Sequence, residues 1–208
     1  MPDLSEVLDT VKNRPELAAK QLGASPMPEI AKFISGGQTS DIDQDTLELG
    51  KRHLLDTFAS IVVSSDLKPA KLARDFAIFN GGKGDASHLL TTNHRVTILD
   101  AILANAITAH AAEINDFCPS AFVQPGPPIV STIIAIGETL GSSGIEVLRS
   151  LLVGYEISCR FPKALGIRNL VRAGISSHGL GPTFGAGAAA ASLLKLPEGK
   201  IGYVMAYC

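Results

Sequence analysis

The segment from Val96 to Ala112 is apolar on almost every side, and it restricts the fold more than any other part of the chain. Isoleucine, leucine and alanine occupy most of its positions. A helix at the surface of a globular protein usually keeps one polar face toward water. A helix with so little polar surface is expected at the centre of a domain, where other elements cover it.

Helical patterns also lie on both sides of this central segment. Asp43 is suited to cap a helix, and apolar residues recur at helical spacing after it. We expect further helices at residues 5–21, 30–34, 69–79, 129–140, 145–161 and 182–194, and from residue 197 onward. Residues 83–95 combine turn-forming residues with a short apolar stretch, which predicts a loop or a minor β-hairpin. The predicted fold class is all-α: a packed helical domain with at most that small hairpin.

Composition agrees with close helix packing and argues against two classes of protein. Hydrophobic residues make up 46% of the 208 residues and aromatic residues only 5%, so the core must be built from aliphatic side chains and alanine. The chain has 18 Lys and Arg residues and 20 Asp and Glu residues. This balance of charge lacks the excess of basic residues that is typical of a nucleic-acid binder. No apolar run reaches the roughly 20 residues that span a bilayer.

The cysteines and the acidic start of the chain predict a cytoplasmic location. Cys118, Cys159 and Cys208 are odd in number and far apart, which indicates reduced thiols rather than a disulfide framework or a zinc site. The first residues do not have the pattern of a signal peptide. Cys118 could act as a nucleophile only if its thiol pKa were lowered, and the sequence offers no partner for that.

The two ends of the chain differ in character. Residues 1–40 are polar and weakly patterned, so we expect an N-terminal extension with short helices, followed by the helical domain at residues 41–208. The last residues, Ile201 to Cys208, are apolar like the inside of a packed helix, whereas a domain usually ends in polar, frayed residues. We therefore expect this chain to be the front portion of a longer protein.

Two clusters of polar residues are candidates for chemistry, because polar groups in an apolar setting are costly without a partner or a purpose. The first cluster follows the central segment and consists of His110, Glu113, Asn115 and Asp116. The second is Ser176-Ser177-His178, immediately before a run of Ala and Gly. We expect the two clusters to meet in space and to line one site that receives an anion.

The Ala and Gly run from Gly185 to Ala191 predicts a helix–helix contact. No strand pattern precedes it, as a dinucleotide-binding fingerprint requires. Small side chains let two helix backbones approach closely, so we expect this helix to pack tightly against a neighbour.

An ordered set of short segments extends over most of the chain from Asp45 onward. It consists of Leu55-Asp56-Thr57-Phe58-Ala59, Ala104-Asn105, His110 to Asp116, Gln124-Pro125-Gly126-Pro127-Pro128-Ile129-Val130, Gly144 to Glu156 with Arg160, Ser177-His178-Gly179, and Phe184 to Leu194. Together these segments resemble the N-terminal helical domain of the MmgE/PrpD family, which includes 2-methylcitrate dehydratase, cis-aconitate decarboxylase and iminodisuccinate epimerase.

This resemblance implies a lyase or isomerase that acts on a small di- or tricarboxylate without a metal or organic cofactor. Removing a proton next to a carboxylate needs a base and donors that stabilise the developing negative charge. The resemblance also implies a homodimer, with the apolar residues 127–154 as either its interface or part of the core. Family members carry a second, α/β lid domain that supplies a lysine and a tyrosine to the active site, and we expect no counterpart of that lid in this chain.

The resemblance assigns roles to individual residues. His178 matches an active-site histidine and is expected to be the base, since an unperturbed histidine titrates near pH ~6.5. Glu113 and Asp116 are expected to assist it. The side chains expected to contact the substrate are His110, Asn115, Gln124 and Ser177. No residue is expected to bind a metal.

The family motif His-x-x-Asp-Phe-Asp-Asp-Thr is only partly present. Glu113 and Asn115 stand in place of its first two Asp residues, and Phe117 stands in place of its Thr. Gln124 replaces the histidine of a following His-Pro pair, and a glutamine cannot exchange protons. The alternative reading is therefore a truncated or degenerate, non-catalytic family member that only self-associates.

Each catalytic assignment also has a simpler structural alternative. His178 could merely cap the helix that follows it. Glu113 and Asp116, three residues apart, would share a face if the helix continued that far, and could then be a solvated helix end. His110 could do no more than hydrogen-bond Glu113. His53 is expected to be structural or exposed.

Overall fold

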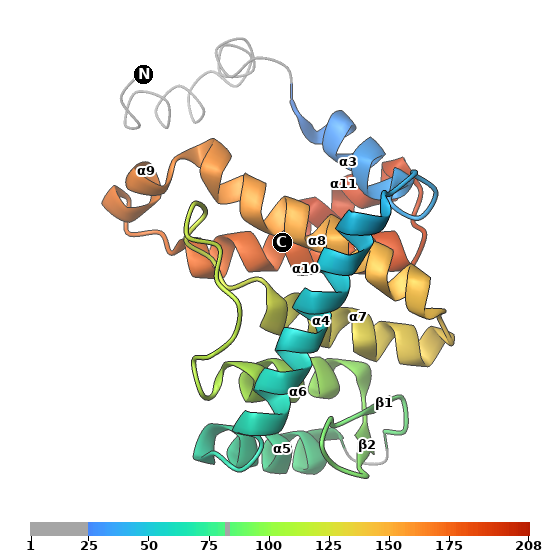
Figure 1. The fold of residues 1–208 in the computed structure, drawn as a ribbon, viewed down its shortest axis with the longest axis vertical. Helices are drawn as coiled ribbons and strands as arrows, with labels where there is room; N and C mark the ends of the chain where they lie inside the picture. Colours follow the sequence, from blue (N-terminus) through green and yellow to red (C-terminus); the bar gives the residue numbers. More distant parts are fainter. Residues whose placement is uncertain (1–24, 82–83) are drawn as a thin grey trace.

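The structure, a computed structural model, describes residues 25–81 and 84–208, and these residues form nine helices and one two-stranded sheet (Figure 1). The helices are α3 (Met27–Gly36), α4 (Gln44–Ser64), α5 (Lys68–Gly81), α6 (Ile98–His110), α7 (Gly126–Leu140), α8 (Gly144–Leu165), α9 (Ile167–Arg172), α10 (Ser177–Leu193) and α11 (Glu198–Tyr207). The antiparallel strands are β1 (Ser87–His88) and β2 (Arg95–Val96). The all-α prediction and the minor hairpin are confirmed, whereas the helix expected at residues 5–21 lies outside the described residues.

Side-chain caps fix where three of the long helices begin. The carboxylate of Asp43 accepts a hydrogen bond from the backbone N–H of Thr46 at 2.8 Å, as its position before α4 predicts. Thr97 caps α6 in the same way. At α8, Ser143 and Glu146 form a reciprocal capping box.

Helix α7 is the centre of the fold. It lies between α6 on one side and α8 and α10 on the other, while α4 runs across these layers (Figure 1). Ile129, Val130 and Ile133 on α7 are completely buried. The apolar region at residues 127–154 therefore contributes mainly to the core, and the structure does not present it as an open interface.

Helix α6 is less central than its composition suggests. Ala101, Ala104 and Ala109 are buried, but Leu99 is 78% exposed and Leu103 is 47% exposed. The prediction that other elements cover this helix on all sides is wrong, because α4, α5 and α7 cover only part of its circumference.

Helices α8 and α10 pack closely through small residues, as the Ala and Gly run predicts. A methyl group added at Gly185 would lie 2.6 Å from Cβ of Ser158 and 2.7 Å from the carbonyl oxygen of Gly154. A methyl group at Gly154 would lie 2.9 Å from Cβ of Ala189. Glycine is needed at both positions because the backbones of α8 and α10 are almost in contact.

Helices α8 and α10 each extend beyond the proline at which the sequence pattern placed one of their ends. Helix α8 continues through Pro162 to Leu165. Helix α10 begins at Ser177, five residues before Pro182, so His178 lies in its first turn and not in a loop. A short helix that was not predicted, α9, lies between α8 and α10.

The first and last described helices pack against each other. Ala31 and Ile34 of α3 share a buried cluster with Ile201 and Met205 of α11. The predicted boundary between an N-terminal extension and the helical domain at residue 40 remains a prediction. Within the described ranges, no helix has the length and apolar character needed to cross a membrane.

Candidate functional site

The first polar cluster lies mostly on the connection between α6 and α7, residues 111–125, which we call the site loop. Helix α6 ends at His110, so Glu113 and Asp116 do not share a helical face. A short antiparallel bridge between Cys118 and Val123 closes a turn within the loop. Pro119 and Pro125 lie within this segment, and neither can continue a helix through it.

Two residues of the site loop have a strained backbone. Glu113 has φ of 53° and Phe122 has φ of 54°, both in the left-handed region that side chains other than glycine seldom adopt. Such conformations cost about 1–3 kcal/mol each and concentrate at functional sites, where the surrounding structure imposes them. The loop therefore holds Glu113 in a conformation that local preference alone would not give.

Asp116 is the most firmly held residue of the loop. One carboxylate oxygen accepts a hydrogen bond from the backbone N–H of Gly126 at 3.0 Å, and the other accepts one from the Tyr155 hydroxyl at 2.7 Å. Nδ1 of His53 lies 3.4 Å from this second oxygen. The Asp116 side chain is only 10% exposed, so the loop is attached here to α4, α7 and α8.

These contacts change the ionisation of the groups around Asp116. Hydrogen bonding to Asp116 raises the pKa of His53, although partial burial opposes the rise. Burial, followed by the charge of Asp116, raises the pKa of Tyr155. Tyr155 therefore stays neutral near pH 7, and its hydroxyl donates a hydrogen bond to the carboxylate.

His178, in the first turn of α10, lies against the site loop. Its ring is nearly parallel to that of Phe117, with centroids 6.2 Å apart, and meets the ring of Phe122 edge-on at 5.1 Å. The buried hydroxyl of Ser177 donates a hydrogen bond to the carbonyl oxygen of Phe122 at 2.7 Å. Ser177 thus attaches the start of α10 to the loop, while two aromatic rings of the loop flank the imidazole of His178.

Glu113 lies between two other predicted site residues. Nε2 of Gln124 donates a hydrogen bond to Glu113 at 3.2 Å, and Nδ1 of His110 lies 3.9 Å from its other oxygen. Burial lowers the pKa of His110, the charge of Glu113 opposes this, and the charge of His178 lowers it further. The two imidazoles are therefore near enough for one to influence the ionisation of the other.

Asn115 offers an unused acceptor in the loop. The residue is buried, and its side-chain nitrogen donates to the carbonyl oxygen of Asp116 at 3.4 Å. Its side-chain oxygen is buried and has no hydrogen-bond partner among the residues that the structure describes. Buried acceptors of this kind usually bind a donor from water or a ligand, so Asn115 could accept a hydrogen bond from a hydroxyl or a protonated carboxyl group.

The thiol of Cys118 is better activated than the sequence indicated. Burial raises its pKa, but hydrogen bonding to the Ser120 hydroxyl and to the Cys159 thiol lowers it by more, so the net shift is downward. Burial raises the pKa of Cys159 to about 12, and the neighbouring Cys118 contributes to this rise. The expectation that Cys118 lacks a partner able to lower its pKa is therefore wrong.

The structure brings all seven predicted site residues to the site loop or to the helix ends that border it. Sequence reasoning missed His53 and Tyr155, which contact Asp116 from α4 and α8. Tyr155 stands in one of the segments that carry the family resemblance, and this was a usable signal. Nothing in the sequence around His53 connects it to a residue 63 positions later.

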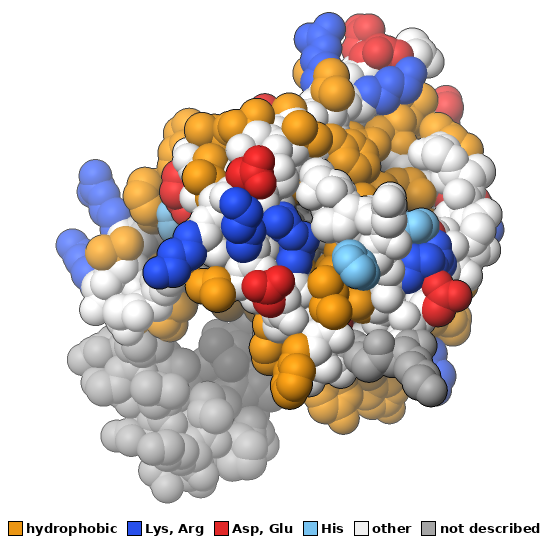
Figure 2. Space-filling model, turned by 90° about the horizontal axis from the view of Figure 1, so that it is seen from below, with side chains coloured by type: hydrophobic (Ala, Val, Ile, Leu, Met, Phe, Trp, Pro, Cys, Tyr) orange, Lys and Arg blue, Asp and Glu red, His pale blue; other side chains and the backbone are white. Residues whose placement is uncertain are grey.

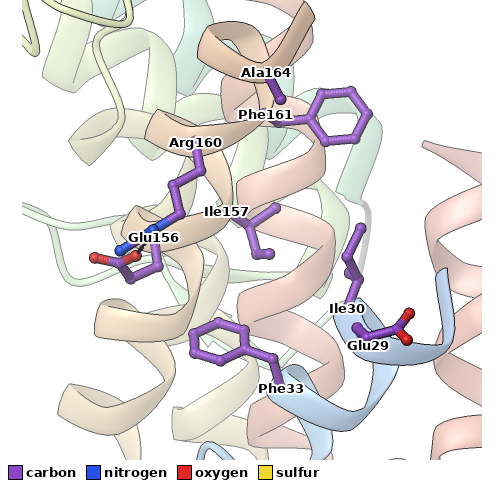
Figure 3. Close-up of a pocket in the computed structure, with 8 residues that line it drawn as sticks. All are labelled: Glu29, Ile30, Phe33, Glu156, Ile157, Arg160, Phe161 and Ala164. Atoms are coloured by element: carbon purple, nitrogen blue, oxygen red, sulfur yellow. Dashed lines mark hydrogen bonds and ion pairs between the residues drawn. The ribbon is translucent and has the colours of Figure 1, made fainter. Parts of the chain in front are cut away.

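A separate apolar cavity of about 490 Å³ lies between α3 and α8 (Figure 3). Ile30, Phe33, Ile157 and Phe161 line it, and Glu156 pairs with Arg160 at its edge. It contains none of the predicted site residues. Apolar walls are suited to an apolar guest, so we assign carboxylate chemistry to the site loop and not to this cavity.

The described residues contain no group of three or more His, Cys, Asp or Glu side chains arranged to bind a metal ion. The site loop offers carboxylates, amides and a thiol, and the helix ends that border it add the imidazoles of His110 and His178.

Comparison with known proteins decides the family. The model of the MmgE/PrpD N-terminal domain matches residues 28–208. The chain belongs to the MmgE/PrpD family. A similar protein is the cis-aconitate decarboxylase-like protein oryM of Aspergillus oryzae, which is 27% identical over 175 residues. The match covers 81% of this chain and 36% of that relative, so the chain spans about a third of the relative's length.

Proposed function

We propose that this chain provides the helical part of an MmgE/PrpD-type lyase or isomerase site for a small di- or tricarboxylate. The reaction class is dehydration, decarboxylation or epimerisation through removal of a proton next to a carboxylate. The observation that carries the proposal is the position of His178, in the first turn of α10 and against the loop that bears Glu113 and Gln124.

His178 supplies the base in this proposal. Its ring is partly exposed, so a substrate can reach it, while Phe117 and Phe122 restrict its orientation. The backbone N–H groups at the start of the 17-residue helix α10 favour an anion near the imidazole. A carboxylate substrate would thereby be bound with its acidic C–H bond near the base.

The remaining loop residues orient the substrate. Glu113 is 70% exposed along its side chain and is paired with Gln124, so both groups are accessible to a bound molecule. The buried oxygen of Asn115 accepts a hydroxyl or carboxyl proton. Asp116 assists indirectly, since its two oxygens are already bound by Gly126 and Tyr155. The scheme uses only side chains and the backbone N–H groups at the start of α10, without a metal or an organic cofactor.

A non-catalytic role is the second candidate, and two contacts favour it. Phe117 stands where the family motif has Thr, and its ring packs beside His178. Gln124 stands where the family has His, and its amide is paired with Glu113. Both substitutions therefore alter the site itself. A family member with these changes could retain only the ability to self-associate.

Activity with three substrates separates the two candidates. The protein is incubated with cis-aconitate, 2-methylcitrate or iminodisuccinate, and proton NMR follows the loss of substrate. We expect one of them to be converted, and His178→Ala to reduce the rate by about 10²–10⁴-fold, the usual contribution of a positioned acid–base group. His94→Ala is the matched control, because His94 is an exposed histidine of the hairpin region.

The same assay contradicts the enzyme proposal if no substrate is converted by this chain or by a longer natural protein that contains it. Full activity of His178→Ala would remove His178 from the base role. The amount of sequence that follows Cys208 in the coding DNA decides whether a lid domain is available to complete the site.

Self-association and a cytoplasmic location complete the proposal. Exposed apolar side chains lie on α4, α5 and α6, among them Val62, Phe76, Phe79 and Leu99. Figure 2 shows the molecule from the α5 end, where apolar side chains lie at the surface between charged ones. We expect sedimentation equilibrium to give twice the 21.7 kDa mass of the chain, and Phe76→Asp to shift it toward the monomer. A monomeric mass for the unchanged protein would contradict the dimer.

A further inference from the structure

Asp116 attaches the site loop to three helices, and only one of its partners changes charge near neutral pH. The backbone N–H of Gly126 is always a donor, and Tyr155 stays protonated because burial and Asp116 raise its pKa. His53 lies 3.4 Å from the carboxylate and is 45% exposed along its side chain. The third attachment is therefore the one that can respond to pH.

The carboxylate of Asp116 is closely packed on the side that faces Gly126. A methyl group added at Gly126 would overlap the Thr57 hydroxyl, lie 2.6 Å from the Asp116 carboxylate and lie 3.0 Å from the Tyr155 hydroxyl. The ring of His53 also packs on that of Tyr155, with centroids 4.8 Å apart. Loss of the contact with His53 would remove one of the three groups that stabilise the charge of the mostly buried Asp116 carboxylate.

The charged and titratable groups that face His53 all favour its protonated form. They are Asp116 from the site loop and Asp56 from α4 itself, and the neutral phenol of Tyr155 lies beside them on α8. Partial burial is the one opposing influence.

Building on the proposed function, we propose that His53 is a positioning residue for the candidate site: its protonated imidazole pairs with Asp116 and thereby stabilises the site loop that carries Glu113 and Gln124. His53 acts through Asp116 and is assigned no contact with substrate. The proposal gives a role to a histidine that the reaction scheme above does not use.

The sign of the pH dependence follows from the direction of the shift. The pKa of His53 in the folded protein is raised above its value in an unfolded chain, about 6.5. The stabilisation of the loop is therefore fully present below pH ~6.5, and it is lost as pH rises through the folded-state pKa. The loop should be ordered at mildly acidic pH and looser at alkaline pH.

An NMR titration of the histidine ring protons tests the pairing without any need for activity. We expect the pKa of His53 to lie above the value of about 6.5 of an unperturbed histidine, and to fall in Asp116→Asn. If Asp116→Asn does not fold, Asp56→Asn gives a smaller fall for the same reason. A His53 pKa at or below the unperturbed value of about 6.5 in the unchanged protein would overturn the proposal.

Hydrogen exchange of the site loop tests the positioning role. After correction for the intrinsic pH dependence of exchange, amides 113–124 should be better protected at pH 5.5 than at pH 8.5. His53→Gln should lose this protection at both pH values, and His53→Arg, which keeps a positive charge, should restore it at both. Equal protection of the site loop in the unchanged protein and in His53→Gln would overturn the proposal. That result would mean that His53 contributes only to α4 and does not stabilise the loop.

Binding of cis-aconitate, measured in the same samples, distinguishes this inference from the proposed function. If exchange follows the prediction and cis-aconitate does not bind, His53 positions the loop and the proposed function fails. If cis-aconitate is converted but neither loop exchange nor binding depends on His53, the proposed function stands and the positioning role is wrong.

Discussion

At the scale of single residues, the geometry of the candidate site depends on the absence of a side chain at Gly126. A Cβ atom there would overlap the hydroxyl of Thr57 and crowd the oxygens of Asp116 and Tyr155. We expect Gly126→Ala to lower the free energy of unfolding by about 1–3 kcal/mol, the usual cost of overpacking. Urea unfolding measures this change.

Gly199→Ala is the matched control for this substitution. No described residue lies within 4 Å of a Cβ atom built at Gly199, which is in the first turn of α11. Its stability should be unchanged or slightly higher, since alanine reduces the freedom of the unfolded chain. Equal stability of the Gly126→Ala and Gly199→Ala proteins would mean that the cluster around Asp116 is loosely packed.

Individual site residues could be predicted where local chemistry marks them. His178 stands out because it is a histidine between a polar cluster and an Ala and Gly run, and Glu113 because it follows an apolar helix. The contact of His53 with Asp116 could not be predicted, since it depends on how α4 lies across α7 and α8. Pairing between residues far apart in sequence is a property of the tertiary structure and leaves no local pattern.

At the scale of helices, the closest contact is that between α8 and α10. We expect Gly185→Ala to destabilise the protein by about 1–3 kcal/mol, because its methyl group would be forced against Ser158 and the backbone of Gly154. Within the described part of the chain, no atom lies within 4 Å of a Cβ atom built at Gly179 on the same helix, so Gly179→Ala should be nearly neutral. Thermal unfolding of the two variants checks the difference.

That comparison also bears on the site, because α10 carries His178 in its first turn. If Gly185→Ala were as stable as Gly179→Ala, α10 would not be fixed against α8 at this point. The position of the imidazole beside the site loop would then lack the support that we infer.

The start of α4 was predicted from its cap, whereas the bounds of the two helices with an internal proline, α8 and α10, were not. Asp43 correctly marks the start of α4. The turn-forming residues before β2 correctly mark the hairpin. Pro182 was taken as a helix start, whereas α10 begins at Ser177 because its first turn packs on the site loop through the hydrogen bond from Ser177 to Phe122. Tertiary contacts of this kind override the local preference of proline.

At the scale of the whole molecule, the apolar composition predicted an all-α domain correctly but did not predict which surfaces are exposed. Helix α6 has apolar residues around most of its circumference, yet Leu99 and Leu103 face outward. Composition does not distinguish a residue that packs in the core from one that lies on a surface available to a partner. The dimer proposed above would give these exposed residues a function.

The central claim is that His178 and the site loop together form a site for a small carboxylate. The most direct measurement is a titration of isotope-labelled protein with cis-aconitate, followed by two-dimensional NMR. We predict that the largest shift changes occur at His178, the side-chain amides of Asn115 and Gln124, and the backbone of Glu113, with His94 unaffected. Changes centred on the cavity between α3 and α8, or no changes at all, would contradict the claim.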